Sequence, residues 1–214
     1  MARLERALAL ALLGGTALLG IGAVFHPMLV GDAASQLRII AATPYWRSLH
    51  LAMLAGSALV ATGVWVRLID RRSTVDLREP ARGGLIAALA VVTVGVCIQA
   101  LNIAYMAGSG THMAALFAEG RTEMSAVFEA THPFGQMVDR LGNLVIALGA
   151  LVLGWAEWQD ASRPRWLAWL AWIAGAFGLI CAVYFNEASP LALAAIGLLS
   201  MWQVGTAARV LLSR

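Results

Sequence analysis

The residues best suited to chemistry in this chain are its four histidines, because each lies beside or within a long apolar segment. His26 comes near the end of the first apolar segment, and His50 lies near the start of the second. His132 opens a later apolar segment, and His112 lies in the polar stretch before it. Imidazole is a common ligand of haem iron, copper and zinc, so these positions suggest a metal or haem site.

The stretch that begins with Thr131 predicts the start of a membrane helix. Thr131 suits an N-cap, and Pro133 suits the first helical turn. At helical spacing, His132 and Asp139 then share one side of the helix. Polar residues inside membrane helices normally face the bundle interior and mark functional sites. We therefore expect His132 to lead the site, and we expect Asp139 and Arg140 to be at least half-buried and paired.

The composition is that of an integral membrane protein. Of the 214 residues, 60% are hydrophobic and only 13% are charged, and the mean hydropathy is +0.76. Those values are too apolar for a soluble domain. The positive charge lies mainly at the ends of apolar segments, so it does not indicate nucleic-acid binding. Cys97 and Cys181 lie in separate apolar segments and are expected to pack as side chains, without a disulfide.

Apolar runs of about 20 residues can cross the hydrocarbon core of a bilayer. The sequence therefore predicts an all-α, six-helix membrane bundle that forms one domain over residues 1–214. A short loop with one amphipathic turn is expected before Pro44, with Thr43 as the N-cap of the second span. Glycines at 108 and 110 should break the helix and open an outer loop, 108–131, with short amphipathic helices. The six predicted spans cover residues 7–30, 44–68, 84–107, 133–158, 166–185 and 190–212.

The arginines predict the orientation in the membrane. Eleven of the fifteen lie on the side that contains both termini, the 67–82 loop and the 159–165 turn, and four lie on the other side. Because positive charge accumulates in cytoplasmic loops, both termini should be cytoplasmic and 108–131 should be outside. We expect a multi-pass protein of the inner (plasma) membrane. All four histidines then lie toward the outer side.

Haem b is the first cofactor that this arrangement suggests. His26, His50 and His132 come from three different spans at similar depth, and His112 is available from the outer loop. Helical bundles commonly hold haem between histidines on facing helices, with arginines near the propionates. Arg47 and Arg140 suit that second role. The sequence therefore predicts a redox protein that transfers electrons to a quinone or to a membrane or periplasmic protein partner.

Copper is the alternative cofactor, because imidazole and thioether ligands suit it and methionines accompany the histidines. Zinc would instead prefer histidine with a carboxylate. At least two of the histidines should approach one centre closely enough to bind a single ion. The candidate metal ligands are His132, His26, His50, His112, Met53, Met137 and Asp139.

Motifs typical of hydrolases and nucleotide-binding enzymes do not occur in the sequence. Whether the chain is an enzyme is therefore left open by its motifs. The same polar residues also fit a third account, in which they only hold helices together. In that account the chain is a cofactor-free structural subunit of a membrane complex.

Overall fold

The computed structural model describes residues 2–71, 73, 80–184 and 190–212, with the side chains of 190–192 excepted. All regular elements in these residues are helices. Six of them are long and apolar enough to cross a membrane, by length and composition. The prediction of an all-α protein with six candidate spans is therefore confirmed.

The described residues form nine α-helices and one π-helical turn, and eight of these α-helices and the turn make up the six candidate spans. α2 lies outside the spans; α3 and α4 together form the second, and α5, the π-helical turn η1 and α6 form the third. The elements are α1 (Ala2–Phe25), α2 (Ala33–Ala42), α3 (Trp46–Gly63), α4 (Val66–Ile69), α5 (Pro80–Tyr105), η1 (Met106–Gly110), α6 (Thr111–Ala118), α7 (Met124–Gln159), α8 (Arg165–Tyr184) and α9 (Pro190–Leu211).

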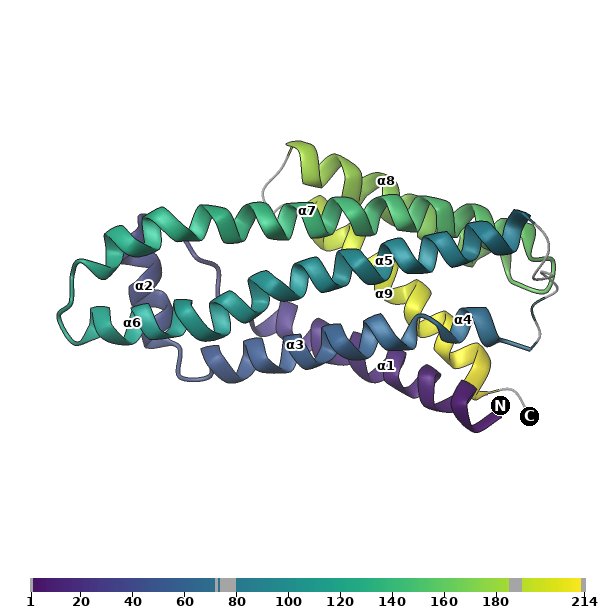
Figure 1. Cartoon of the computed structure of the whole chain (residues 1–214), viewed down its shortest axis with the longest axis horizontal. Coiled ribbons are helices and arrows are strands. Elements are labelled where there is room, and N and C mark those ends of the chain that lie inside the picture. Colours follow the sequence, from purple (N-terminus) through teal and green to yellow (C-terminus); the bar gives the residue numbers. More distant parts are fainter. Residues whose placement is uncertain (1, 72, 74–79, 185–189, 213–214) are drawn as a thin grey trace.

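The longest contact in the bundle is between α5 and α7, which lie side by side along its length (Figure 1). α1 packs on α3 and α9, while α8 packs on α7 and α9. α2 and α6 lie together at one end, and the start of α1 and the end of α9 lie at the other. The fold thus has a distinct end, made by α2, α6 and the start of α7, that is called the α2–α6 end below.

Glycines allow the closest helix contacts. A Cβ on Gly15 of α1 would lie 2.7 Å from the Gly56 carbonyl oxygen of α3, and one on Gly95 of α5 would lie 2.9 Å from the Gly142 carbonyl oxygen of α7. No side chain fits at such distances. These pairs bring the helix backbones together, as small residues do in membrane bundles.

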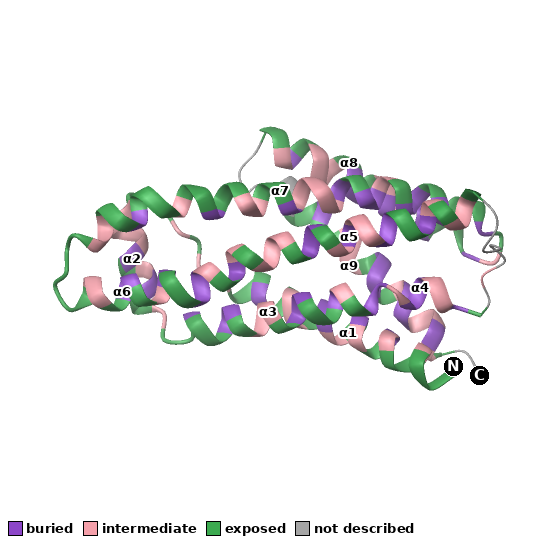
Figure 2. Ribbon diagram, viewed as in Figure 1, coloured by how far each residue is buried: buried purple, intermediate pink, exposed green. Residues whose placement is uncertain are grey.

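Large apolar side chains remain exposed along the outer faces of the helices, whereas the buried residues face the bundle axis (Figure 2). Val24, Phe134, Met137 and Leu101 are examples of the exposed group. A soluble protein rarely leaves so much apolar surface open, and lipid is the solvent that such a surface fits.

The start of α7 differs from the prediction. The helix begins at Met124, so Pro133 lies inside it and Thr131 is not an N-cap. Gly120, with φ +93°, ends α6 in the left-handed conformation, and Arg121 N–H bonds the Leu116 carbonyl. Such a glycine-terminated end leaves the chain free to begin a new helix within a few residues. His132 therefore lies in the third turn of α7 rather than in its first.

The prediction that the helix would break at Gly108–Gly110 is also wrong. The chain continues from α5 into α6 through η1, a π-helical turn. The wider turn shifts the backbone hydrogen bonds, and Thr111 Oγ1 donates to the Met106 carbonyl at 3.1 Å. Short π turns are often found at functional sites.

The segment before the second span is more regular than expected. α2 is a ten-residue helix, and the Asp32 carboxylate caps it by accepting a hydrogen bond from Ser35 N–H at 2.8 Å. Hydrogen bonds from Ser35, from its side chain first and its backbone N–H second, lower the pKa of Asp32. Thr43, expected as an N-cap, is instead the C-cap of α2, and α3 begins at Trp46. The turn expected at 186–190 lies almost wholly outside the described residues.

Candidate functional site

Two of the four histidines meet. His26 follows the last residue of α1, and His50 lies in the second turn of α3. Their Nε2 atoms are 3.3 Å apart. The ring centroids are 5.1 Å apart and the rings are steeply inclined, so the contact is made by the nitrogens and not by stacked faces.

Trp46 orients this pair. The Trp46 carbonyl accepts a hydrogen bond from His50 Nδ1 at 2.8 Å. A carbonyl can only accept, so His50 carries its proton on Nδ1 and presents the lone pair of Nε2 to His26. The Trp46 ring lies 4.4 Å from the His50 ring and 4.9 Å from the His26 ring, by centroids. A histidine fixed by a backbone carbonyl is the usual arrangement of a metal ligand.

The π turn η1 in turn holds Trp46. Trp46 Nε1–H donates to the Met106 carbonyl, at 3.3 Å, and the Trp46 side chain is buried. η1 therefore positions the tryptophan that orients His50. The sequence signal for this feature was the glycine pair at 108 and 110, which was interpreted as a break.

Burial favours the neutral form of the His26 imidazole. His50 is only 2% exposed, and His26, just beyond α1, is half-buried. Burial, and after it the neighbouring His50, lower the pKa of His26 to about 4, although a backbone hydrogen bond with Pro27 acts in the opposite direction. Neutral imidazole is the form that binds metal ions.

Met53 brings a thioether to the contact between α1 and α3, the helices that carry the histidine pair. Met53 lies one turn beyond His50 on α3, and Gly22 lies one turn before His26 on α1. A Cβ on Gly22 would lie 2.8 Å from Met53 Sδ. The absence of a side chain at Gly22 thus makes room for the thioether between the two helices.

His132 belongs to a different environment. Its ring stacks on Phe128, with centroids 4.6 Å apart and an interplanar angle of 15°. Its Nε2 lies 3.3 Å from Gln136 Nε2. Over the described residues, no group of three or more histidine, cysteine, aspartate or glutamate side chains is placed to hold a metal ion. His132 and His112 therefore do not complete a three-ligand site with the His26–His50 pair.

The remaining candidates lie at the surface. His112, Arg47, Arg140 and Met137 are exposed. The expectation that Arg140 would be buried and paired is wrong, because residue 140 turns outward from α7 while residue 139 turns inward. No ion pair of Arg140 occurs within the described part of the chain.

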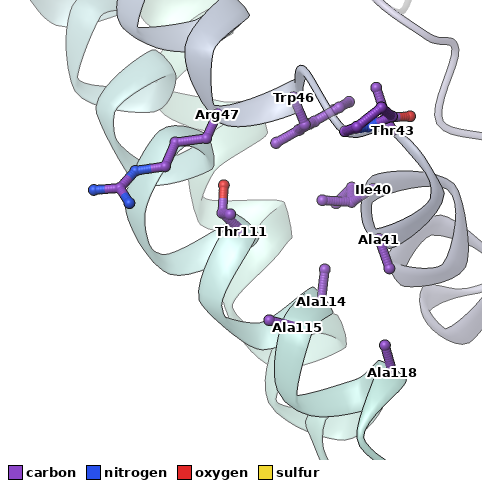
Figure 3. A pocket seen from close by; sticks show the side chains of 10 residues that line it. Ile40, Ala41, Thr43, Trp46, Arg47, Thr111, Ala114, Ala115 and Ala118 are labelled. Atoms are coloured by element: carbon purple, nitrogen blue, oxygen red, sulfur yellow. The ribbon is translucent and has the colours of Figure 1, made fainter.

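Arg47 lies at the edge of an apolar pocket of about 250 Å³ at the α2–α6 end (Figure 3). Small side chains of α6 and the end of α2 form most of its wall. The Arg47 guanidinium points away from this wall. The pocket contains no histidine, so it is separate from the pair. Its lining is Ile40, Ala41, Thr43, Pro44, Trp46, Arg47, Thr111, Ala114, Ala115 and Ala118.

Asp139 is half-buried, as expected, but its partner is a neutral amide and not a charged side chain. It accepts a hydrogen bond from Asn143 at 2.8 Å, and Asn143 accepts one from Gln99 of α5 at 2.7 Å. Farther along the same contact, Tyr105 and Thr131 hydroxyls are 2.7 Å apart. A line of polar side chains thus runs between α5 and α7.

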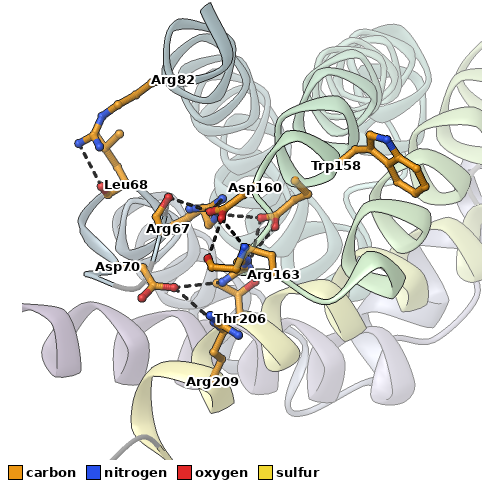
Figure 4. A network of polar contacts seen from close by, with 12 residues as sticks. Arg67, Leu68, Asp70, Arg82, Trp158, Asp160, Arg163, Thr206 and Arg209 are labelled. Atoms are coloured by element: carbon orange, nitrogen blue, oxygen red, sulfur yellow. Dashed lines mark hydrogen bonds and ion pairs between the residues drawn. The ribbon is translucent and has the colours of Figure 1, made fainter. Parts of the chain in front are cut away.

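The largest polar cluster lies at the opposite end and was missed by the sequence analysis (Figure 4). Arg67 of α4 donates to Glu157 at 2.8 Å and to Asp160 at 2.7 Å. Arg163 donates to Glu157 at 2.7 Å and to Asp70 at 3.3 Å. All five side chains are buried.

This cluster, called the arginine network below, joins three helices and two turns. Arg163 also donates to Thr206 of α9 at 2.8 Å, and Arg209 lies 3.6 Å from Asp70. Burial lowers the pKa of Arg163, while Glu157 and Asp70 raise it. The arginines were interpreted as loop charges, although Glu157, Asp160 and Arg163 at i, i+3 and i+6 were a signal for an internal cluster.

No protein-family model, no curated protein and no solved structure matches this chain.

Proposed function

We propose that this chain is a membrane copper protein, in which His26 and His50 bind one copper ion at the outer side of the bundle. The observation that carries the proposal is the 3.3 Å approach of the two Nε2 atoms, with His50 fixed through its Nδ1 by the Trp46 carbonyl. With the lone pair of His50 Nε2 facing it, His26 would donate its own Nε2 proton to His50 when no ion is bound. A bound ion would replace that proton.

The spacing fits shared coordination of one ion. Two imidazole nitrogens, each about 2.0 Å from an ion, lie about 3.3 Å apart when the angle at the ion is close to tetrahedral. The pair therefore needs little movement to bind. His50 is already held, and His26, next to Pro27 at the end of α1, needs only to change which nitrogen carries its proton.

The surrounding atoms favour copper over zinc. No third histidine, cysteine or carboxylate joins the pair among the described residues, which leaves a thioether or an external molecule as the further ligand. Met53 supplies a thioether on the same side of α3. Imidazole with thioether is a soft ligand set that suits Cu(I), whereas zinc favours thiolate, imidazole and carboxylate.

Haem b stays a prediction that the geometry supports less well. Axial nitrogens on opposite faces of one haem lie about 4 Å apart with the macrocycle between them. The His26–His50 contact is shorter than that, and Trp46 lies against both rings. A haem held by His132 would need a second ligand from elsewhere.

The proposed role follows from the place of the pair. With both termini in the cytoplasm of a plasma-membrane protein, the copper ion would lie near the outer surface. It could then accept or donate one electron as it changes between Cu(II) and Cu(I), with a membrane or periplasmic protein as partner.

Purified protein and two measurements test the proposal. Elemental analysis after exposure to copper should give one copper per chain, and the visible spectrum should lack a Soret band. A Soret band with no copper would support haem instead. Absence of both would support the cofactor-free subunit.

A further inference from the structure

A second cavity, lined by both polar and apolar side chains, lies between α2 and α7, and it is independent of the histidine pair. Its volume is about 180 Å³. Engineered cavities of about 150 Å³ hold a benzene ring, so a single substituted ring is the size that fits. The cavity is lined by Ala33, Gln36, Phe128, Glu129, His132, Pro133 and Gln136.

Two buried polar atoms of this lining have no hydrogen-bond partner in the described part of the chain, namely His132 Nδ1 and Gln36 Oε1. An unsatisfied buried polar atom costs about 1–3 kcal/mol, so such atoms usually mark an absent water or ligand. Here both belong to one cavity. One is on α7 and the other is on α2, so a single bridging group would join the helices.

The hydrogen bonds that His132 and Gln36 already make show whether His132 Nδ1 and Gln36 Oε1 are donors or acceptors. Gln136 Nε2 is an amide donor, so His132 Nε2, 3.3 Å away, accepts, and the His132 proton is on Nδ1. Gln36 Nε2 donates to the Gly31 carbonyl at 3.0 Å. The other amide atom, Gln36 Oε1, is therefore left as an acceptor without a donor. The buried unpaired atoms of the cavity are thus one N–H donor and one carbonyl acceptor, and the exposed Glu129 adds a carboxylate to the lining.

A hydroxyl group satisfies both atoms, because it accepts from His132 and donates to Gln36. A quinone carbonyl can only accept, so it would leave Gln36 unsatisfied. Ala33, Phe128 and Pro133 supply apolar wall for a ring. Phe134 and Met137, next to the cavity on α7, are exposed apolar side chains, so a lipid-soluble ring could enter from the bilayer.

We propose that the cavity between α2 and α7 binds the hydroxylated ring of a membrane quinol, through His132 Nδ1–H and Gln36 Oε1. The quinol should bind at least about tenfold more tightly than the matching quinone, because the quinone leaves a buried acceptor unpaired. Its dimethyl ether should bind as weakly as the quinone. The assignment is for binding only and involves no electron transfer step.

The test uses the full chain in lipid nanodiscs and a benzoquinol with a ten-carbon tail. Affinity is measured for the quinol, the quinone and the dimethyl ether, with empty nanodiscs as the partition background. His132→Phe and Gln36→Leu should each weaken quinol binding at least tenfold. His112→Phe, an exposed histidine outside the cavity, is the matched control and should leave binding unchanged.

Two outcomes would overturn the proposal. In one, the three ring compounds bind equally, or binding survives both variants. In the other, no compound binds above the nanodisc background, and the cavity holds water alone. Gln36→Glu keeps an acceptor at this position, so it should retain more affinity than Gln36→Leu if both fold as judged by circular dichroism. His50→Ala should leave quinol binding intact, which separates this site from the copper proposal.

Discussion

Trp46 donates a hydrogen bond from its indole nitrogen to the Met106 carbonyl, which belongs to the π turn between α5 and α6. The same residue accepts from His50 through its own carbonyl. A connection therefore runs from an irregular turn in the third span, through a buried indole, to the histidine pair. The site depends on the packing of α3 against η1 and not only on the two ligands.

Trp46→Phe tests this connection. The variant keeps an aromatic ring but loses the bond to Met106, so α3 should hold His50 less firmly. Loss of a supporting contact of this kind typically weakens metal binding about 10–100-fold. The measurement is copper affinity by competition with a chelator. Trp158→Phe, at the far end of the bundle, is the control, and equal affinities for the two variants would contradict the account.

Arg163→Met should strongly destabilise the protein. It removes the arginine that Glu157 and Asp70 share and leaves these buried carboxylates with only Arg67 and Arg209 as cationic neighbours. Breaking a buried pair costs about 3–5 kcal/mol. Thermal unfolding in detergent, followed by circular dichroism, measures the effect. Arg165→Met, an exposed arginine in α8 two residues away, should change the midpoint little. A small effect at Arg163 would mean that the arginine network is not a stabilising unit.

The contact between α1 and α3 predicts a contrast between two glycines. A Cβ at Gly63 would lie 2.4 Å from the Leu12 backbone nitrogen, whereas nothing lies within 4 Å of one at Gly197. Gly63→Ala should therefore lower stability by about 1–3 kcal/mol, because backbone must move. Gly197→Ala should be neutral or stabilise by about 0.5–1 kcal/mol, since alanine is the better helix former. Similar unfolding midpoints for both variants would show that α1 and α3 do not make the close backbone contact between Leu12 and Gly63.

The orientation in the membrane is tested by labelling from outside intact cells. In a background in which Cys97 and Cys181 are replaced, a cysteine at Ala118 should react with a membrane-impermeant reagent. A cysteine at Ala161 should react only after the membrane is opened. The physical reason is the arginine asymmetry, which remains eight to four when Arg67, Arg163 and Arg209 of the arginine network are left out. The reverse labelling pattern would place the histidine pair in the cytoplasm.

The six candidate spans were predictable because length and apolarity alone determine what can cross a bilayer. Helix starts were not, since Pro133 suits a first turn but is also tolerated inside α7. The approach of His26 and His50 was foreseeable, because His26 follows the end of one span and His50 lies near the start of the next, at the same depth of the bundle. The surroundings of His132 were not predictable, because α2, which lines the same cavity, was expected to be a short loop. Arg140 was misplaced because one residue along a helix turns the side chain by about 100°.

Titration of the purified protein with Cu(I) tests the central claim most directly. The account predicts one tightly bound ion per chain in the unchanged protein. His26→Ala and His50→Ala should each lower the affinity by more than about tenfold, while His112→Ala should bind as the unchanged protein does. X-ray absorption of the bound ion should show two nitrogen ligands at about 2.0 Å. Full-affinity binding by the His26→Ala, His50→Ala double variant, or no binding by the unchanged protein, would contradict the proposed copper site.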